Sequence, residues 1–504
     1  MEKTVISMMI VIVMTKVLGF TRDIILAYFY GASNISDAYL ISMTIPSVFF
    51  AIVALGIHTS FIPVYTRLRE NEGERAAALF TSNLTNIVLL FTVLMTVILM
   101  LFPTVAVQLF ASGFDEETRQ LAITFTRISA IGMMFTALIF ISQGLLEVHG
   151  RYTLSSLSGL PLNILTILFI YLSVEYHLYL LAVGTLVALA GQFLFFGPAL
   201  WKIGYRHKWK ISLKEKSIRN IFYMAMPVVI GVSVNQLNVL VDRTLASRII
   251  EGGISAIAYT DRVVYFIQGI FITALVTVMF PKITKLAARK NMQQLKEIVG
   301  KVISAAMLLV IPSTIGMMLF SKEIIALLFG RGAFGEAEVA MTGGVLFFYS
   351  LGLLGYGLRE VLTKVFYSLE DTKTPMINAT CTVVLNIGLN LVLSKTMGIN
   401  GLALATSISA LTSIVLLYAA LVRKIGTLHT KDTVADLWKA LLASGIMGIA
   451  AKGMYEAAGE ITPGIIALGI GILTGVLVYG GVLWLLRQND VIRYQMRIWT
   501  IAKK

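Results

Sequence analysis

Charge and cysteine are both scarce in this chain of 504 residues, and each shortage excludes a class of protein. Only 13% of the residues are charged and 57% are hydrophobic, whereas soluble domains carry about 25% charged residues. So little charge cannot cover the water-facing surface of a chain this long, which excludes a soluble enzyme and a disordered chain. The single cysteine, Cys381, excludes an intrachain disulfide and a cysteine metal cluster.

Motifs for catalysis and nucleotide binding are missing as well. The five histidines are scattered, and no His-Glu-x-x-His, Walker or nucleophile-elbow motif occurs. We therefore expect no enzymatic activity and no cofactor other than a coupling ion. Without a nucleotide-binding domain, uphill transport would use an ion gradient, the membrane potential or downstream consumption.

Long apolar segments occupy most of the sequence instead. A helix needs about 20 apolar residues to cross a bilayer, and these segments are too long and too uniformly apolar for barrel strands. The sequence therefore predicts an all-α polytopic membrane protein of about fourteen helices, the first retained because no small-residue cleavage site follows it. The predicted spans are 4–30, 36–65, 76–110, 119–147, 153–176, 178–201, 218–247, 255–281, 297–320, 337–367, 375–395, 399–422, 435–457 and 463–486.

Basic residues predict the orientation of these spans. About 26 Lys and Arg fall in one set of alternate loops and the two termini, against six in the opposite set. Basic loops stay in the cytoplasm, so we expect both termini there. This topology also explains the net charge of +14 without a nucleic-acid partner.

The densest basic stretch is 202–219, which begins Lys-Ile-Gly-Tyr-Arg-His-Lys-Trp-Lys. One interpretation is contact with anionic inner-leaflet lipids, to which each basic residue near the surface contributes about 1 kcal/mol. The other is a linker that fixes the topology between two halves of the chain.

An internal duplication relates these halves. An even number of helices per half makes the repeat parallel and suggests alternating access around a central site; no selectivity-filter-like loop supports a channel. We predict lobes 1–201 and 218–422, a linker 202–217, and 423–504 as helices thirteen and fourteen with a basic tail. The paired motifs, 218 to 223 residues apart, are Asp37-Ala38-Tyr39 with Ile257-Ala258-Tyr259, Phe61-Ile62-Pro63 with Met279-Phe280-Pro281, Phe110 with Phe329, and Leu162-Asn163-Ile164 with Leu385-Asn386-Ile387.

Ionisable residues inside spans cost about 2.5–3.5 kcal/mol each, so they normally face a cavity or a partner. Lys16, Arg22 and Asp23 lie in the first span, and Asp261 and Arg262 in the eighth. The surplus of cations predicts a cavity for an anionic ligand, and the planar fork of arginine suits a phosphate. Structural ion pairs between helices and snorkelling to the interface are the alternatives. Further charged residues in spans are Asp37, Arg127, Asp242, Arg243, Arg359, Glu360 and Lys364.

A second group of polar residues is nearly uncharged. Asn386 and Asn390 lie four residues apart, hence on one helix face, with Asp242 and Thr406 on two other spans. Their oxygens could hold a small hard cation such as Na⁺, or the side chains could hydrogen-bond helices together.

Several motifs, in order across about 1–420, resemble the MurJ (MviN) family. This family comprises bacterial lipid II flippases of the multidrug/oligosaccharidyl-lipid/polysaccharide exporter superfamily. The motifs are Leu18-Gly19-Phe20-Thr21-Arg22-Asp23, Gly31-Ala32, Ser36-Asp37-Ala38-Tyr39, Val241-Asp242, Tyr259-Thr260-Asp261-Arg262, Arg331-Gly332-Ala333-Phe334, Phe366-Tyr367-Ser368 and Asp371-Thr372-Lys373-Thr374-Pro375.

The resemblance implies a monomer in the bacterial plasma membrane, with two lobes in a V around a cationic cavity. The cavity would take the pyrophosphate and sugar-peptide head of lipid II, and a groove toward helices thirteen and fourteen would take its polyprenyl tail. The resemblance makes Arg22 and Arg262 the cavity arginines, with Asp23, Asp37 and Asp261 beside them. The family's sodium site falls on Asp242, Asn386, Asn390 and Thr406, with a main-chain oxygen near Leu402.

The chain departs from the family pattern at three positions. Lys16 replaces an arginine, Asn390 stands where a second carboxylate is expected, and no charge occurs near Phe50 and Ala51, where the family has a basic residue. The last difference leaves room for a flippase of another undecaprenyl-linked polysaccharide unit. A drug/cation antiporter would instead need an apolar, acidic cavity, and a membrane scaffold for cell-wall enzymes would explain no cavity charge.

Overall fold

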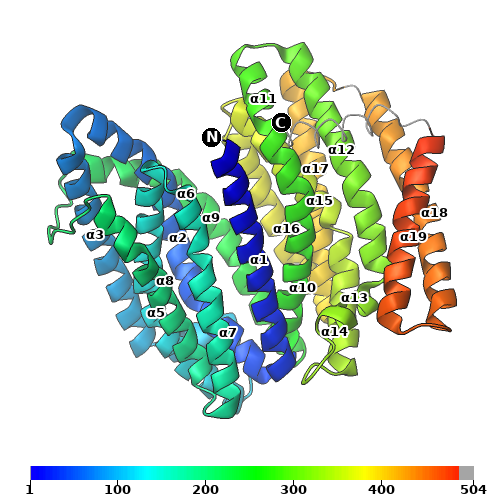
Figure 1. The fold of residues 1–504 in the computed structure, drawn as a ribbon, viewed down its shortest axis with the longest axis horizontal. Coiled ribbons are helices and arrows are strands. Elements are labelled where there is room, and N and C mark those ends of the chain that lie inside the picture. The colour runs from blue at the N-terminus through cyan, green and yellow to red at the C-terminus, as the bar shows by residue number, and fades with distance from the viewer. Residues whose placement is uncertain (1, 429, 487–504) are drawn as a thin grey trace. The chain divides into compact units, whose positions relative to one another are not determined.

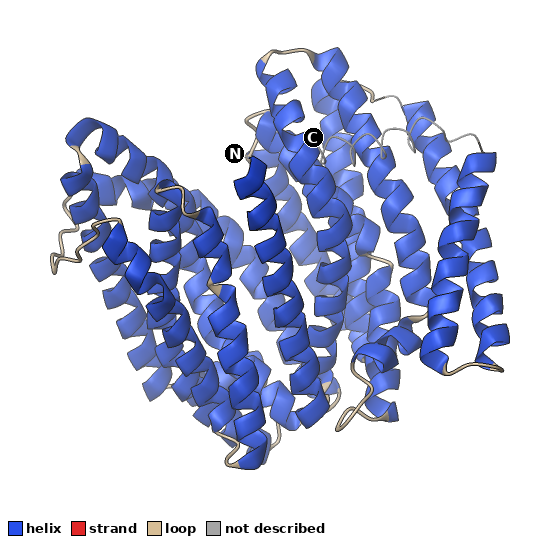
Figure 2. Cartoon of the chain, in the orientation of Figure 1, coloured by secondary structure: helices blue, strands red, loops and turns tan. Residues whose placement is uncertain are grey.

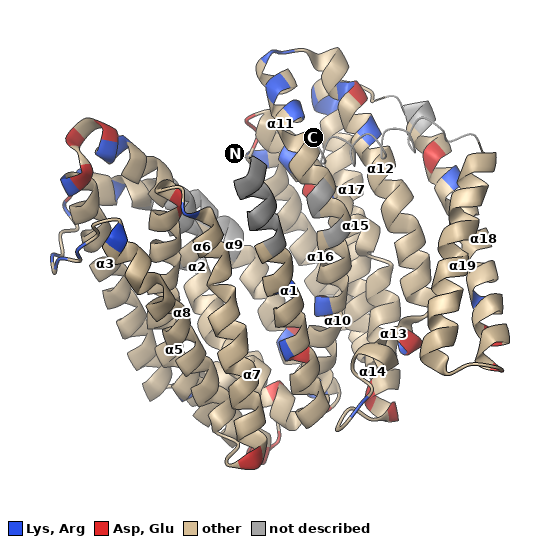
Figure 3. Ribbon diagram, in the orientation of Figure 1, with Lys and Arg blue, Asp and Glu red and all other residues tan. Residues whose placement is uncertain are grey.

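The computed structural model of the chain describes residues 2–428 and 430–486 (Figure 1). All regular elements in these ranges are helices (Figure 2). Helices satisfy their own backbone hydrogen bonds, which a lipid environment requires. Charged residues lie mostly near helix ends, although α1 and α10 also carry charge between their ends (Figure 3). The prediction of an all-α polytopic protein is confirmed; the predicted basic tail beyond residue 486 lies outside the described residues.

Two compact units divide the chain. The first is Met1–Ser255 with Arg331–Gly335, and the second is Ala256–Gly330 with Glu336–Lys504. The predicted lobe boundaries rest on the sequence repeat, which this division does not test, so they stay a prediction.

The first unit is built around α5, which packs against α2, α3 and α8. Ile139 and Leu146 of α5 form a buried cluster with Phe196 of α8. Its helices are α1 (Glu2–Tyr30), α2 (Asn34–Glu72), α3 (Glu74–Leu101), α4 (Pro103–Phe110), α5 (Glu116–Val148), α6 (Tyr152–Leu157), α7 (Gly159–Glu175), α8 (Leu180–Lys202) and α9 (Lys216–Ile249).

In the second unit α12 packs against α11, α14, α15 and α18, and α18 pairs with α19. Phe320, Ala451 and Leu468 fasten the α18–α19 pair to the unit. The helices are α10 (Gly253–Gln268), which begins in the first unit, the π-helix η1 (Gly269–Thr273), α11 (Ala274–Ala288), α12 (Met292–Leu319), α13 (Ser321–Leu328), α14 (Glu336–Ser350), α15 (Leu353–Ser368), α16 (Lys373–Met397), α17 (Ile399–Ile425), α18 (Thr430–Gly459) and α19 (Gly464–Leu485).

Each of the fourteen predicted spans coincides with helical chain, but several spans are not one continuous helix. Within the described ranges, nine helices are long and apolar enough to cross a membrane, or ten when α14 and α15, bent by 44°, count as one. The span predicted at 76–110 breaks at Phe102 into α3 and α4. The hydropathy of the sequence does not predict this break because α3 and α4 are both apolar.

The helix boundaries repeat along the chain as the sequence motifs do. Helices α3 and α12 are both 28 residues long, and their first residues are 74 and 292. Helices α4 and α13 are both eight residues long and start at 103 and 321, the same offset of 218. Phe102 and Phe320 interrupt the two halves with similar backbone angles, φ −123°, ψ 43° and φ −112°, ψ 25°. Because only the first break precedes a proline, proline alone does not cause it.

Candidate functional site

Arg22 is held in place by two neighbours inside the first unit. Its Nε and Nη2 donate to Oδ1 of Asp23 at 3.0 and 2.7 Å, and its Nη1 donates to Oδ1 of Asn163 at 3.3 Å. The side chain of Arg22 keeps 24% of its surface exposed, against 11% for Asp23. A guanidinium has five N–H donors, so two of them remain for a ligand. Arg22 is therefore a positioned cation that solvent can still reach.

Asn163 of α7 is a site residue that sequence reasoning missed. It is buried, and its Nδ2 donates to the carbonyl oxygen of Gly159 at 2.8 Å, which fixes the amide for Arg22. A signal was available, because Asn163 is the repeat partner of Asn386, one of the predicted sodium ligands. In the sequence, the repeat predicts only the arrangement of the helices. Asn163 is not included among the predicted site residues.

The other predicted substrate residues are divided between the units. Lys16 is exposed on α1 of the first unit, whereas Arg262 is exposed on α10 of the second, next to the half-buried Asp261. The structure thus places each cation on a predicted span. A shared cavity for Arg22 and Arg262 stays a prediction.

Asp37 of α2 does not contact Arg22 but binds the beginning of α10. Its buried carboxylate accepts hydrogen bonds from N and Oγ of Ser255, both at 2.7 Å, and from N of Ile254 at 3.3 Å. Arg243 donates to the carbonyl oxygen of Ile254 at 3.0 Å. A carboxylate at a helix N-terminus satisfies otherwise unpaired N–H groups. Asp37 therefore fastens α2 to the α9–α10 turn.

The same end of the first unit is joined by close backbone contacts, which we call the glycine junction: Gly31, Gly113, Gly252 and Gly332. Gly31 and Gly332 have φ of +62° and +64°, and Gly252 has φ of +73°. A Cβ on Gly252 would overlap the carbonyl oxygen of Ala32, and one on Gly113 would overlap the backbone of α9. Only glycine fits at such approaches.

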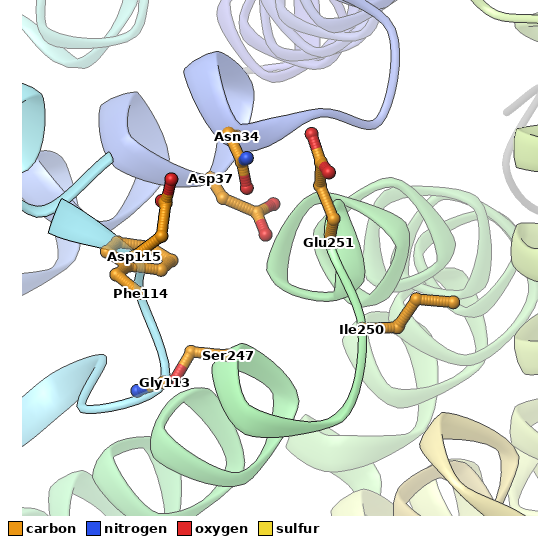
Figure 4. Close-up of a pocket in the computed structure, with 8 residues that line it drawn as sticks. All are labelled: Asn34, Asp37, Gly113, Phe114, Asp115, Ser247, Ile250 and Glu251. Atoms are coloured by element: carbon orange, nitrogen blue, oxygen red, sulfur yellow. Dashed lines mark hydrogen bonds between the residues drawn. The ribbon is translucent and has the colours of Figure 1, made fainter. Parts of the chain in front are cut away.

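Hydrogen bonds reinforce the junction between the end of α9 and the α4–α5 region. Oγ1 of Thr244 donates to the carbonyl oxygen of Leu109 at 2.7 Å, and Nε of Arg248 donates to Oγ of Ser112 at 2.7 Å. A polar pocket of about 260 Å³ lies beside these contacts (Figure 4). Its lining residues are Asn34, Asp37, Gly113, Phe114, Asp115, Ser247, Ile250 and Glu251.

The Arg331-Gly332-Ala333-Phe334 motif is explained by this junction. Its backbone N–H at Ala333 donates to the carbonyl oxygen of Tyr28 at 2.8 Å. A Cβ on Gly31 would come within 2.6 Å of the carbonyl oxygen of Ala333, and one on Gly332 would overlap Tyr28. The motif thus closes on the end of α1, which the sequence did not reveal.

Three of the four predicted sodium ligands meet in the second unit. Nδ2 of Asn390 donates to Oδ1 of Asn386 at 2.8 Å, and Nδ2 of Asn386 donates to Oγ1 of Thr406 at 3.2 Å. Oγ1 of Thr406 donates to the carbonyl oxygen of Leu402 at 2.9 Å. Amide and hydroxyl oxygens are ligand types that hard cations take, but the oxygens of Asn386 and Thr406 each already accept an amide N–H. The same contacts also match the alternative of helix-to-helix hydrogen bonding.

Asp242, the one carboxylate of that set, belongs to α9 of the first unit and accepts from Nδ2 of Asn238 at 3.2 Å. No group of three His, Cys, Asp or Glu side chains in the described ranges could hold a metal ion. Any cation site would therefore depend mainly on amide, hydroxyl and main-chain oxygens.

Two further family positions have structural roles here. Phe50 is buried and packs edge-to-face on Phe140 at 5.7 Å between ring centroids, so apolar packing occupies the place of the expected basic residue. Asp371 of the Asp-Thr-Lys-Thr-Pro motif accepts hydrogen bonds from N and Oγ1 of Thr374 at 3.0 and 2.8 Å, which caps α16. Lys424 of α17 donates to the same carboxylate at 2.6 Å.

Comparison with known proteins identifies the family. The model of the family described as "Lipid II flippase MurJ" matches residues 26–470. The chain belongs to the MurJ family. A probable lipid II flippase MurJ of Thermotoga maritima is 30% identical, covering 86% of each chain. Another, of Buchnera aphidicola subsp. Baizongia pistaciae, is 29% identical and covers 88% of each chain.

Solved structures agree with this MurJ assignment. A lipid II flippase MurJ in an inward closed conformation has a TM-score of 0.83 and 26% identity, covering 96% of this chain and 100% of that one. An inward-facing multidrug resistance MATE family transporter of the MOP superfamily has a TM-score of 0.69 and 14% identity, covering 84% and 99%. The second likeness shows the fold alone. MurJ proteins are named as lipid II flippases, which agrees with the expectation that the chain is not an enzyme.

Proposed function

We propose that this protein flips lipid II from the inner to the outer leaflet of the bacterial plasma membrane by alternating access. Membership of the MurJ family supports the substrate class. The observation that carries the proposal at residue level is Arg22, a cation within a predicted span, fixed by Asp23 and Asn163 yet partly exposed. A purely structural ion pair would not need to leave donors accessible.

The charged head group sets the mechanism. A group with two or more negative charges cannot cross about 30 Å of hydrocarbon unaided. Arg22 and Arg262, with Lys16, neutralise the pyrophosphate while the polyprenyl tail stays in lipid. Asp23 and Asn163 keep three of the five guanidinium donors while the other two bind the substrate, so Asp23 stays paired with Arg22 whether or not the substrate is present.

The glycine junction acts as the exterior gate in this mechanism. It lies at the helix ends opposite the basic loops, so the positive-inside rule puts it in the periplasm and both termini in the cytoplasm. Opening it breaks the Asp37–Ser255 and Arg248–Ser112 bonds, and closing it restores them. We propose that the protein works as a monomer, as the family resemblance implies.

A sodium ion at Asp242, Asn386, Asn390 and Thr406, with the main-chain oxygen of Leu402, is proposed as the coupling or structural ion. When bound, it would supply charge balance for the single carboxylate. The neighbouring amide and hydroxyl oxygens support it, and the absence of a second carboxylate makes binding weak.

Complementation tests the proposed function. Expression of the chain in a bacterium depleted of its lipid II flippase is expected to restore growth and to expose lipid II to a lipid II-cleaving enzyme added outside spheroplasts. Failure of both, with the protein present in the membrane, would overturn the proposal. Rescue of a strain lacking a different undecaprenyl-linked glycan flippase instead would favour the alternative that the uncharged Phe50 position suggests.

A further inference from the structure

The basic stretch between α8 and α9 is fastened to α3 through its main chain. We call residues 203–215 the linker strap. Nδ2 of Asn86 donates to the carbonyl oxygens of Lys208 and Lys210 at 2.9 and 3.0 Å. Asn83 pairs with both backbone groups of Ser212, at 3.0 and 2.8 Å. A linker that only joined two halves would not need these bonds.

The residues that hold the strap are buried, so its course is fixed. Asn83 and Asn86 expose 0% and 2% of their surface. Nδ2 of Asn83 also donates to the carboxylate of Glu215 at 2.8 Å, and Oγ of Ser82 accepts from N of Lys208 at 3.2 Å. Every one of these bonds uses the strap's backbone or its one acidic side chain. The basic side chains therefore remain available.

The free side of the strap combines cationic and apolar groups. The exposed cations are Arg206, Lys208, Lys210 and Lys214. Between them Trp209, Ile211 and Leu213 are 83%, 56% and 61% exposed. Tryptophan and basic residues together are typical of the membrane–water interface. These four cations stand against one carboxylate in the strap, Glu215, which is half-buried and hydrogen-bonded to Asn83, so this face carries a net positive charge.

An apolar pocket of about 210 Å³ lies beneath the strap. Both α3 and α8 pack on α5, and the strap residues Tyr205, His207 and Trp209 cover the space between them. Partial burial lowers the pKa of the His207 imidazole below its usual value. The helix residues that line the pocket are Thr81, Thr85, Leu89, Leu138, Ile141, Ser142, Leu145, Phe193 and Leu200.

The pocket borders the lipid-facing surface. Leu90 of α3 and Leu194 of α8, each next in sequence to a lining residue, are 59% and 69% exposed. In a membrane-spanning unit such residues face acyl chains. The lining residues Leu89 and Phe193 are themselves only half-buried, so the pocket lies close to the apolar surface of α3 and α8.

We propose that the linker strap and the pocket beneath it bind one anionic phospholipid, its phosphate on the strap cations and an acyl chain in the pocket. The fixed backbone presents the cations without further backbone ordering, so only their side chains lose freedom on binding, and the positive face selects an anionic over a zwitterionic head group. The site is separate from the cationic residues proposed for the flipped substrate.

Quenching of Trp209 fluorescence tests the site in the full-length protein in nanodiscs. Phosphatidylglycerol or phosphatidylcholine with brominated tails is added at equal mole fractions, and the Trp209 signal is the difference between wild type and Trp209→Phe. We expect stronger quenching by the glycerol lipid. A basic residue near an anionic surface contributes about fivefold, so replacing Arg206, Lys208 and Lys210 by Gln lowers this preference on the order of 100-fold.

Controls separate the site from general surface charge and from chain insertion. Replacing Lys282, Lys285 and Arg289, three exposed cations of the second unit, by Gln should leave quenching unchanged. Ser142→Phe, which fills the pocket, should reduce quenching while the strap cations persist. Equal quenching by both lipids, an unchanged preference after neutralising the strap, or full quenching with the filled pocket would each overturn the proposal. The measurement requires no flipping, so it stands or fails independently of the proposed transport.

Discussion

Arg22 shows how one residue can be both costly and useful in a membrane helix. A cation in a span costs about 2.5–3.5 kcal/mol on insertion scales, and the bonds to Asp23 and Asn163 offset that cost. Because Asp23 is itself buried, removing Arg22 alone would take away the guanidinium that this carboxylate binds at 2.7 Å. Stability and function must therefore be separated when this residue is tested.

Arg22→Ala and Arg262→Ala are each expected to abolish complementation of a flippase-depleted strain. Arg→Lys at either position should retain part of the activity, since the charge survives but the bidentate fork does not. Arg22→Gln combined with Asp23→Asn removes the buried charge imbalance, so it should restore the melting temperature but not growth. Growth equal to wild type with both alanine variants would contradict the cationic-site model.

Asp371 predicts an acid-dependent loss of stability. Its hydrogen bond from Lys424, followed by that from the Thr374 N–H, lowers the pKa of this carboxyl to about 2. An unfolded aspartate has a pKa of about 3.9, so the stabilisation is complete above about pH 4 and is lost as the pH falls toward 2. Asparagine can still cap the helix, so Asp371→Asn should cost at most about 1 kcal/mol at pH 7, through loss of the ion pair with the half-exposed Lys424.

Melting temperatures in detergent from pH 7 to pH 2.5 check this expectation. The curves of wild type and Asp371→Asn should converge as the pH falls. Glu72→Gln, an exposed position at the end of α2, serves as the control and should run parallel to wild type. A constant gap between wild type and Asp371→Asn down to pH 2.5 would count against the role of the carboxylate.

At the scale of elements, the contacts and breaks at helix ends explain more of the family motifs than the lengths of the helices do. The breaks at Phe102 and Phe320 recur with the same offset, and Asp37 and Asp371 each bind the first residues of a helix. The glycine junction likewise joins turns to one another. A family motif can thus stabilise the end of a helix without contacting the substrate.

Gly332→Ala is expected to destabilise the junction more than Gly150→Ala does. Both glycines have positive φ, +64° and +71°, which costs an alanine about 1–2 kcal/mol. A Cβ would overlap Tyr28 at Gly332 but meets nothing within 4 Å at Gly150. The difference in melting temperature between the two variants isolates the effect of the steric overlap with Tyr28. Equal melting temperatures would show that Tyr28 moves aside without a measurable loss of stability.

At the scale of the whole molecule, the proposed alternating access requires that the helix ends at the glycine junction separate and meet again. The first unit joins them through Gly252, which touches Ala32, and through the polar bonds around Ser247 and Arg248. Small residues permit this approach, and hydrogen bonds to carbonyl and hydroxyl groups are easily exchanged for water. Such an interface can open repeatedly at modest cost.

Cysteines at positions 32 and 253 should cross-link and block flipping until a reductant is added. The variant carries Ala32→Cys, Gly253→Cys and Cys381→Ser, and it leaves Gly252 with its positive φ intact. Single-cysteine variants should flip normally with or without oxidant. Efficient cross-linking with undiminished lipid II exposure would mean that these ends need not part.

Sodium should raise the melting temperature if the proposed ion site exists, because a ligand that binds only the folded form stabilises it by mass action. Asp242→Asn should remove the response, since the only carboxylate of the set is lost. Potassium and choline at equal ionic strength are the controls. Equal melting temperatures in sodium and potassium for wild type would leave Asn386, Asn390 and Thr406 as a hydrogen-bonded cluster only.

The sequence alone determined the class of protein, the positions of the spans, the internal repeat and the residues of interest in the first helix. These features follow from hydropathy, charge bias and spacing, which are local properties of the chain. Only tertiary structure decided that Asn163 positions Arg22, that Asp37 binds Ser255, and that Arg331–Gly335 closes on Tyr28. Those contacts join residues about 140 to 300 positions apart, and a pairwise contact at such separation leaves no periodic signal in one sequence.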